Sequence, residues 1–254
     1  MTIPQTTTTP HPTIKDLILT FTEEDHSYVD NNDRIYTSVS AIIHEQFNPF
    51  DERATAERIA AKRGKTPDQL IAEWHAKRDA ACAYGTRVHE HGEFILSRGA
   101  SGVKQASDCE KEAMALKCME TACERLEDQF ELIACEQKVF SPKYLVAGTA
   151  DLLMRHKKTR VAHVLDFKTN EEITTKFYDR GRGICAHLTD CNQTHYQLQM
   201  SIYETLMRSE GIFDREEPVN RAIIHIPPFS TAPKWIPLPY LKHAVPILVA
   251  RLLP

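Results

Sequence analysis

The spacing of hydrophobic positions changes about half-way along the chain. In the second half, short apolar-rich segments at 131–140, 144–154 and 161–168 are separated by polar turns. Segments of this length predict consecutive strands, and their short connections favour an antiparallel meander. The chain then returns to helical spacing over 194–207. Beyond it the pattern predicts a strand at 221–226, an extended stretch at 233–239, and a terminal helix at 241–253 that is interrupted or bent near Pro246.

The first half of the chain has mainly helical spacing. It opens with a predicted hairpin over 17–39 whose turn lies at 31–33, and Ser38 or Ser40 can cap the helix that follows. Further helices are predicted at 51–63, 67–97 and 107–129, with a break at the glycine-rich stretch 98–102. The whole pattern predicts an α/β (α+β) protein, in which a small mixed central sheet is flanked by helices and preceded by a hairpin and a helical extension.

We expect one integrated domain, because 254 residues with 42% hydrophobic content can bury one sizeable core. Residues 1–13, rich in Thr and Pro, predict a flexible tail. Residues 14–130 then hold the hairpin and helices, and 131–254 form the core of the domain. No apolar run approaches the roughly 20 residues that span a bilayer. The start of the chain has no apolar signal core, so we expect a cytoplasmic protein without a membrane partner.

The seven cysteines are an odd number, and none of them forms a CxxC pair. A zinc ribbon needs such pairs, and a secreted disulfide framework needs an even number of cysteines. The pattern therefore favours reduced thiols with a mostly structural role.

The charge of the chain is unevenly distributed. The net charge is −4, but ten Lys and Arg stand against five Asp and Glu between Lys138 and Arg182. Such a basic strip can bind phosphates while the rest of the molecule stays acidic, although a solvated charged surface explains it equally well. The cations that we expect to contact a nucleic-acid backbone are Lys157, Lys158, Arg160, Lys176, Arg180 and Arg182.

The strongest chemical signal lies on the second and third predicted strands. Asp151 ends the run Ala147–Asp151 within one strand segment, and Asp166 and Lys168 follow in the next. Side chains alternate along a strand, so Asp166 and Lys168 share a face while Phe167 points to the opposite layer. Two carboxylates on adjacent strands suit Mg²⁺ or Mn²⁺, because buried charge is costly unless it is paired or metal-bound. An Asp–Lys ladder at a sheet edge is an equally good explanation of these residues alone.

Two helices add further polar groups. On the first, His89 shares a face with Gly85 and Gly92, which lets the helix approach the sheet, and Glu93 lies one turn further on. An imidazole beside carboxylates suits Mn²⁺ somewhat better than Mg²⁺. On the second, Gln199 interrupts an apolar stripe that also holds Tyr196, Met200, Tyr203 and Met207. A lone histidine or one tolerated glutamine is more often structural, so each signal is weak by itself.

Taken together, the segments GTRVH, GTAD, LDFKT and QMSIY occur in an order that resembles the PD-(D/E)XK nuclease superfamily, in particular its RecB-type branch. The similarity extends from about Tyr84 to Ile226, with Ala150 in place of the proline of the superfamily name. The stretches HLTDCNQTHYQLQMSIY and SVSAII are similar to exonuclease-like members from phages and mobile elements. The resemblance implies a restriction-endonuclease-like core and two Mg²⁺ or Mn²⁺ ions.

The resemblance also implies a role for each motif residue. His89, Asp151 and Asp166 would be metal ligands together with the main-chain carbonyl of Phe167. The helical spacing, rather than the resemblance, predicts that Glu93 orients His89. Lys168 would orient or activate the attacking water. The supporting catalytic residues would be Gln199, Tyr203 and Glu136, although Glu136 is explained nearly as well as a partner of Lys138 or Lys143. The cysteine spacing lacks the late cysteines of iron–sulfur members, which predicts no cluster.

The function that follows from the resemblance is a metal-dependent DNA exonuclease acting in recombination, repair or replication, in a phage or mobile element. Helices between residues 40 and 129 are expected to roof the cleft and admit a strand end, although a lid for a partner or a dimer would use the same residues. The expected partners are DNA, single-stranded or duplex, and a single-strand-annealing or recombination protein. Alternatives are a structure- or site-specific endonuclease and a non-catalytic DNA-binding module.

Overall fold

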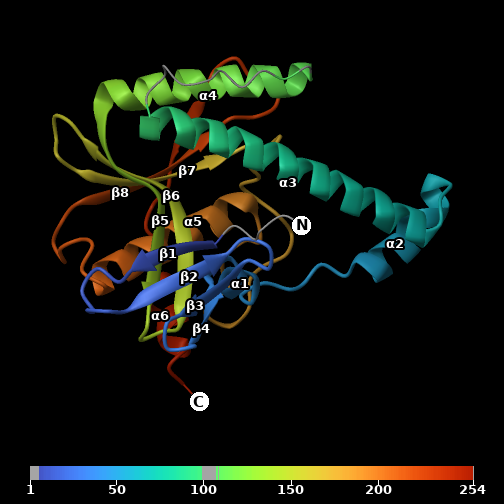
Figure 1. The fold of residues 1–254 in the computed structure, drawn as a ribbon. Coiled ribbons are helices and arrows are strands. Elements are labelled where there is room, and N and C mark those ends of the chain that lie inside the picture. Colours follow the sequence, from blue (N-terminus) through green and yellow to red (C-terminus); the bar gives the residue numbers. More distant parts are fainter. Residues whose placement is uncertain (1–5, 99–106, 108, 254) are drawn as a thin grey trace.

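The computed structural model describes residues 6–98, 107 and 109–253, and it has the mixed α/β architecture predicted from the sequence (Figure 1). The strands follow the order β1-β2-β3-β4-β6-β7-β8-β9, with β5 along the other edge of β6. No helix in the described part of the chain is both long and apolar enough to cross a membrane.

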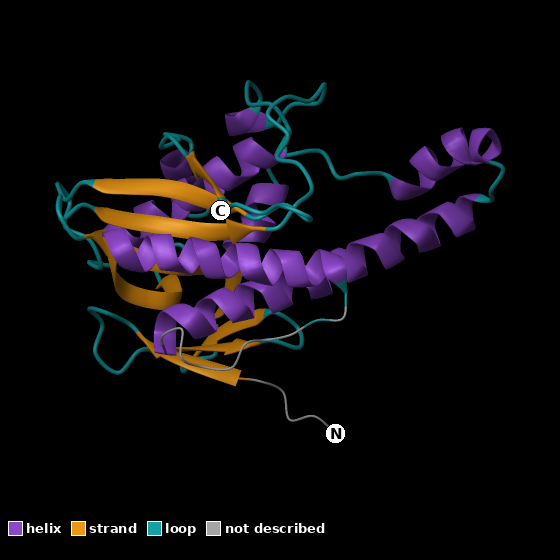
Figure 2. Cartoon of the chain, turned by 90° about the horizontal axis from the view of Figure 1, so that it is seen from above, coloured by secondary structure: helices purple, strands orange, loops and turns teal. Residues whose placement is uncertain are grey.

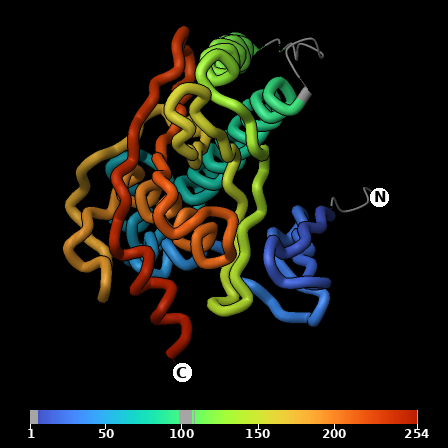
Figure 3. The backbone as a smooth tube through the Cα atoms, turned by 90° about the vertical axis from the view of Figure 1, so that its left-hand side faces the viewer, coloured from blue at the N-terminus to red at the C-terminus, as the bar shows by residue number. Residues whose placement is uncertain are grey.

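The predicted meander forms the centre of the sheet. Its strands are β5 (Phe130–Ser141), β6 (Val146–His156) and β7 (Ala162–Lys168), and each is antiparallel to the next. The sheet continues through β8 (Val219–His225), parallel to β7, to β9 (Lys234–Pro237), antiparallel to β8. Figure 3 shows the long β5–β6 hairpin standing between the N-terminal strands in blue and the C-terminal part in orange and red.

The N-terminal strands differ from the sequence prediction in two ways. The segment expected as a tail contains β1 (Thr6–Pro10), which pairs with β2 (Ile18–Thr22), so a flexible tail through Thr13 is wrong for these residues. Residues 1–5 lie outside the described part. The expected single hairpin is a meander, because a turn at 23–26 separates β2 from β3 (Ser27–Asp30) before β4 (Ile35–Ser38). Threonine is β-branched and suits an edge strand, which composition alone does not reveal.

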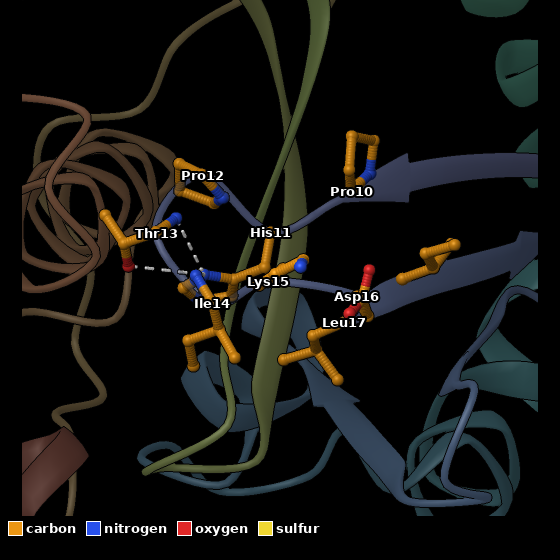
Figure 4. Close-up of a pocket in the computed structure, with 9 residues that line it drawn as sticks. Pro10, His11, Pro12, Thr13, Ile14, Lys15, Asp16 and Leu17 are labelled. Carbon is orange, nitrogen blue, oxygen red and sulfur yellow. Dashed lines mark hydrogen bonds between the residues drawn. The ribbon is translucent and has the colours of Figure 1, made fainter.

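A buried histidine anchors the β1–β2 loop. The main-chain N–H groups of Thr13 and Ile14 donate to Nδ1 of His11 at 3.2 and 3.0 Å, as the close-up in Figure 4 shows for Thr13. Since Nδ1 accepts, the ring hydrogen sits on Nε2, which faces Glu210 Oε2 at 3.0 Å. This bond ties the N-terminal strands to the C-terminal end of a helix almost two hundred positions away.

The helices agree closely with their predicted ranges. They are α1 (Val39–His44), α2 (Glu52–Ala60) with the short 3₁₀ turn η1 (Ala61–Arg63), α3 (Pro67–Arg98), α4 (Glu110–Gln129), η2 (Gly183–Cys185), α5 (Asn192–Ser209) and α6 (Ala244–Ala250). Ser38 caps α1 by accepting from the Ala41 N–H. The terminal helix begins later than predicted, and Pro246 lies in its first turn, where a missing N–H costs no hydrogen bond. The expected interruption is therefore absent from α6.

Apolar side chains cover both faces of the sheet. Leu152, Leu165 and Phe167 pack into a core with α3 and α4. Their neighbours Leu153 and Val164 pack into a second core with α1, α5 and α6. Because α1 shares the second core with strands from the C-terminal half, the two halves of the chain are built around common cores.

The helical extension covers the sheet only in part. In Figures 1 and 2, α2 and the first half of α3 project away from the sheet as an arm, and the second half of α3 lies beside α4. The arm has its own small core of Ala56, Ala60 and Leu70, with Trp74 packed against it. The expectation that all helices between 40 and 129 roof a cleft is therefore wrong for the arm, which finds its apolar contacts within itself.

Candidate active site

The two aspartates identified in the sequence lie next to each other. Leu152 pairs with Leu165, which places Asp151 of β6 opposite Asp166 of β7. The Phe167 N–H donates to Asp151 Oδ2 at 2.9 Å. Asp166 is only 2% exposed. The two residues are fifteen positions apart in the sequence, and the β6–β7 turn brings them together.

Lys168 completes this pair on the same strand. Its Nζ forms an ion pair with Asp166 Oδ2 and lies 4.9 Å from the centre of the Tyr196 ring. Burial opposes the charge of the ammonium, but Asp166 and Asp151 outweigh it and raise the pKa of Lys168 above its ordinary value. Lys168 is therefore protonated at neutral pH and can stabilise negative charge rather than accept a proton.

His89 reaches the carboxylates from α3. Its Nδ1 lies 3.2 Å from Asp151 Oδ2, and its ring meets the Phe167 ring edge-to-face with centroids 5.9 Å apart. Burial would lower the pKa of His89, but the contact with Asp151 outweighs it and raises the pKa. The structure thus brings together the histidine, both aspartates and the lysine that the sequence singled out.

The two glycines near His89 have different neighbours. A Cβ added at Gly85 would stand 3.2 Å from Thr169 Oγ1, just beyond β7. A Cβ added at Gly92 would stand 2.6 Å from Met119 Sδ on α4. Only Gly85 therefore brings the helix close to the end of a sheet strand, and the expectation for Gly92 is wrong, since that glycine serves helix–helix packing.

Glu136 and Glu93 enlarge the acidic cluster. Glu136 lies opposite Asp151 on β5, with a left-handed φ of 49° that is unusual for a residue with a side chain. Burial, and then Asp151, raise the pKa of Glu136 to about 7. Burial also raises the pKa of Glu93, against a smaller opposing effect of Lys138. Lys138 Nζ is 3.5 Å from Glu136 Oε2, so the pairing weighed from the sequence is present, with Lys138.

Glu93 does not take the role expected for it. Within the described residues, the polar partner of the His89 ring is Asp151, and no contact joins the ring to Glu93. Glu93 lies one helical turn further along α3, where it acts on Asp151 and Lys138 through charge.

The stripe on α5 borders the same site. Gln199 Nε2 donates to the Tyr203 hydroxyl at 3.2 Å. Tyr203 packs so closely on Gly148 that an added Cβ there would lie 2.6 Å from Cε1 of the ring. Gly148 therefore lets the tyrosine lie flat against β6, a constraint that the sequence did not reveal although GTAD contains this glycine.

Two further tyrosines were missed as neighbours of the site. Tyr196 covers the Lys168 ammonium, and its hydroxyl donates to Asn170 Oδ1 at 2.7 Å. Tyr28 of β3 lies 3.3 Å from Thr149 Oγ1 through its hydroxyl. Tyr196 belongs to the helical stripe and could have been found from it. Tyr28 comes from a distant strand, and nothing in its local sequence indicates the contact.

The six basic residues form two groups at opposite ends of β7. The turn group, Lys157, Lys158 and Arg160, joins β6 to β7, and the loop group, Lys176, Arg180 and Arg182, follows Lys168. β7 lies between the two groups in the chain and spans roughly 20 Å, at about 3.3 Å per residue. Arg160 pairs with Glu131 and Lys157 donates to the Glu127 carbonyl, both at 2.6 Å. The six cations thus belong to two different connections, the β6–β7 turn and the loop between β7 and α5.

The donor set of the site fits a hard divalent cation. In the part of the chain that the structure describes, no three His, Cys, Asp or Glu side chains are already gathered around one point at metal-binding geometry. In this cluster four carboxylates face two lysines and the His89 imidazole. Burial, and then Asp151, raise the pKa of Asp166 to about 6. Oxygen ligands and surplus negative charge are what Mg²⁺ and Mn²⁺ bind.

The comparisons with known proteins leave the family open. No family model and no curated protein matches the chain. The solved structures that are similar include one described as "Crystal structure of SSO0001", which is 16% identical over 63% of this chain and 81% of that chain, with a TM-score of 0.23. A similarity at this level carries no argument about function, so the interpretation rests on the geometry of the site.

Proposed function

We propose that this protein is a Mg²⁺- or Mn²⁺-dependent deoxyribonuclease that cuts phosphodiester bonds at the site around Asp151, Asp166 and Lys168. The observation that carries the proposal is the meeting of these three side chains with His89, from three separate elements, in a cluster with excess negative charge. The PD-(D/E)XK-like order of motifs supports the same chemistry. A purely structural ion pair would not need the additional carboxylates of Glu136 and Glu93.

Each residue has a distinct task in this proposal. Asp151, Asp166, His89 and the Phe167 carbonyl would hold the metal, which when bound supplies a nucleophilic water and charge stabilisation. The protonated Lys168 offsets negative charge that develops on the phosphoryl group. Tyr196 restricts the position of Lys168. Gln199 and Tyr203, joined by a hydrogen bond, form a polar wall beside the site.

Action from DNA ends is the finer part of the proposal. It is supported by the similarity to exonuclease-like sequences and by the loop group of cations, which lies 8–14 residues after Lys168 in the loop that leaves β7. The α2–α3 arm projects away from the sheet, so it does not enclose the site and adds no support for action from ends. The proposed partner of such an exonuclease is a recombination or single-strand-annealing protein.

Digestion of three substrates tests both parts. End-labelled single-stranded DNA, linear duplex and covalently closed circles are incubated with the wild type in Mg²⁺, in Mn²⁺ and in chelator. We expect linear DNA to be degraded only with metal, while circles persist. Equal rates on circles would replace the exonuclease by an endonuclease. Tight DNA binding without cleavage under any metal would favour the non-catalytic module instead.

A further inference from the structure

Two histidines that are distant in sequence meet at the surface, outside the residues assigned to the candidate active site. His187 lies in the loop between β7 and α5, and His243 immediately precedes α6. Their Nε2 atoms are 2.8 Å apart, their ring centroids are 4.6 Å apart, and the ring planes cross at 46°. His187 is exposed and His243 is half-buried, so the pair is open to solvent on one side.

The backbone on both sides of the pair is held in place. Arg180 donates to the His187 carbonyl at 3.0 Å, and the Gly181 N–H donates to the Leu188 carbonyl at 3.0 Å. The Ile247 N–H donates to the His243 carbonyl at 3.0 Å in the first turn of α6. The two rings are thus presented to each other from fixed positions, which reduces the entropy lost when both bind one ligand.

The distance between the nitrogens suits a shared transition-metal ion. Metal–imidazole bonds of about 2.0–2.1 Å put two nitrogens about 2.9 Å apart at a right angle and about 3.3 Å apart in a tetrahedron. We propose that His187 and His243 form a two-imidazole site for a borderline ion such as Ni²⁺, Cu²⁺ or Zn²⁺, with water in the remaining positions. Imidazole nitrogen is a poor ligand for Mg²⁺, so Mg²⁺ should not occupy this site, whereas the oxygen ligands of the carboxylate site suit Mg²⁺.

Binding requires both Nε2 lone pairs, whereas the metal-free pair shares one N–H···N hydrogen bond. The proton on one Nε2 must therefore move to Nδ1 of its own ring, with no net proton release. In the described residues, Nδ1 of His243 is buried without a hydrogen-bond partner. No donor is directed at this nitrogen among the described residues, so it can take the proton, and the metal–nitrogen bonds must outweigh the cost of a buried N–H without an acceptor. An ion at this site would connect the loop that starts after Lys168 to the C-terminal helix.

Calorimetric titration with Ni²⁺ tests the site on the full chain, with excess Mg²⁺ present to fill the carboxylate site. The variants are His187→Ala, His243→Ala and their combination, with His26→Ala as the matched control because His26 is an exposed histidine on another turn. We expect each single variant and the double variant to lose the same one equivalent of Ni²⁺, while His26→Ala keeps it.

Thermal unfolding provides a second readout. Ni²⁺ should raise the unfolding midpoint of the wild type and of His26→Ala, since a ligand that binds only the folded state stabilises it, and should leave the His187→Ala midpoint unchanged. Equal Ni²⁺ stoichiometry in all variants, or an equal midpoint shift in His187→Ala, would overturn the proposal and leave the pair as a hydrogen bond. Neither readout depends on DNA cleavage.

Discussion

Two buried charge clusters border α5, and their balances of charge are opposite. At one, the Glu204 carboxylate accepts from Arg208 Nε at 2.9 Å and forms an ion pair with Arg221 of β8. Arg208 also donates to the carbonyls of Asp214, Arg215 and Glu217, and Arg221 to those of Val219 and Leu238. Two guanidiniums thus surround one carboxylate, and their remaining donors are used by the main chain.

At the other cluster, Asp151, Asp166, Glu136 and Glu93 outnumber the lysines beside them. The pKa values of Asp166 and Glu136 are raised to about 6 and about 7, because burial and a neighbouring carboxylate disfavour their charge. The comparison teaches that burial alone does not mark a functional charge. In the first cluster the guanidiniums and main-chain groups satisfy one carboxylate, whereas in the second the carboxylates outnumber the cations, and under the proposed function a bound metal ion would balance them.

The largest expected effect comes from Asp166→Asn. We expect cleavage to fall by at least about 10³-fold, more than the roughly 10–100-fold that changes around a ligand usually cost. The exposed Asp214→Asn is the matched control and should cleave like the wild type. Rates on labelled linear DNA at saturating Mg²⁺ measure both, and undiminished cleavage by Asp166→Asn would separate the acidic cluster from the activity.

The same variant should be more stable than the wild type when no metal is present. A carboxyl whose pKa is raised on folding contributes stability that is complete below its unfolded pKa and is lost as the pH rises through about 6. Asparagine does not ionise, so we expect a gain of roughly 1–3 kcal/mol at pH 8, at about 1.4 kcal/mol per pKa unit, and a smaller gain at pH 4. Denaturant unfolding in chelator measures it.

Glu204→Gln should have the reverse phenotype. Removing the buried carboxylate leaves two half-buried guanidiniums without their counter-charge, which we expect to cost about 1–3 kcal/mol of unfolding free energy, less than the roughly 3–5 kcal/mol of a fully buried pair. Cleavage per folded molecule should stay near the wild-type value, because the cluster does not touch Asp151 or Asp166. Glu216→Gln, at an exposed position, is the control. A large loss of cleavage with unchanged stability would show that the two clusters are not separate in function.

His89→Ala should have an intermediate effect on activity. Loss of one ligand beside Asp151 is expected to weaken metal use about 10–100-fold, with partial recovery at higher Mn²⁺. Binding of DNA itself should change little. The metal dependence of the rate, compared with that of the exposed neighbour Glu90→Gln, measures this. If the two variants show the same metal dependence, His89 is not a ligand.

The smallest expected effect concerns the two basic groups. Changing Lys176, Arg180 and Arg182 to Gln should reduce the slope of log affinity against log salt by about one for each phosphate that is no longer neutralised. The same changes at Lys157, Lys158 and Arg160 should have less effect, because Arg160 is already paired with the Glu131 carboxylate, whereas Arg180 and Arg182 donate to main-chain carbonyls. Equal slopes for both sets of variants would mean that neither group is preferred by the DNA backbone.

The parts of the fold with a clear period could be predicted from the sequence. Apolar spacing identified α3, α4 and the three central strands, and strand alternation put Asp166 and Lys168 on one face. The pairing of Asp151 with Asp166 followed, because a short turn sets the register of an antiparallel pair. These predictions rest on local geometry, which is why they agree with the structure.

Other features depend on tertiary contacts that no local pattern contains. The strand at Thr6–Pro10 depends on an edge offered by β2 and on the burial of His11. Gly92 could face the sheet or another helix, and only the position of Met119 decides it. The basic residues are close together in the sequence, but they belong to the two connections on either side of β7, and apolar spacing does not show how those connections lie.

The most direct test of the central claim is Mn²⁺ binding to the acidic cluster without DNA. Titration of metal-free protein is followed by electron paramagnetic resonance of free Mn²⁺, for the wild type, for Asp151→Asn/Asp166→Asn and for the control Asp214→Asn. We predict that the wild type and the control bind Mn²⁺ and that the double variant loses this binding while it stays folded. Equal Mn²⁺ binding by all three proteins would contradict the account.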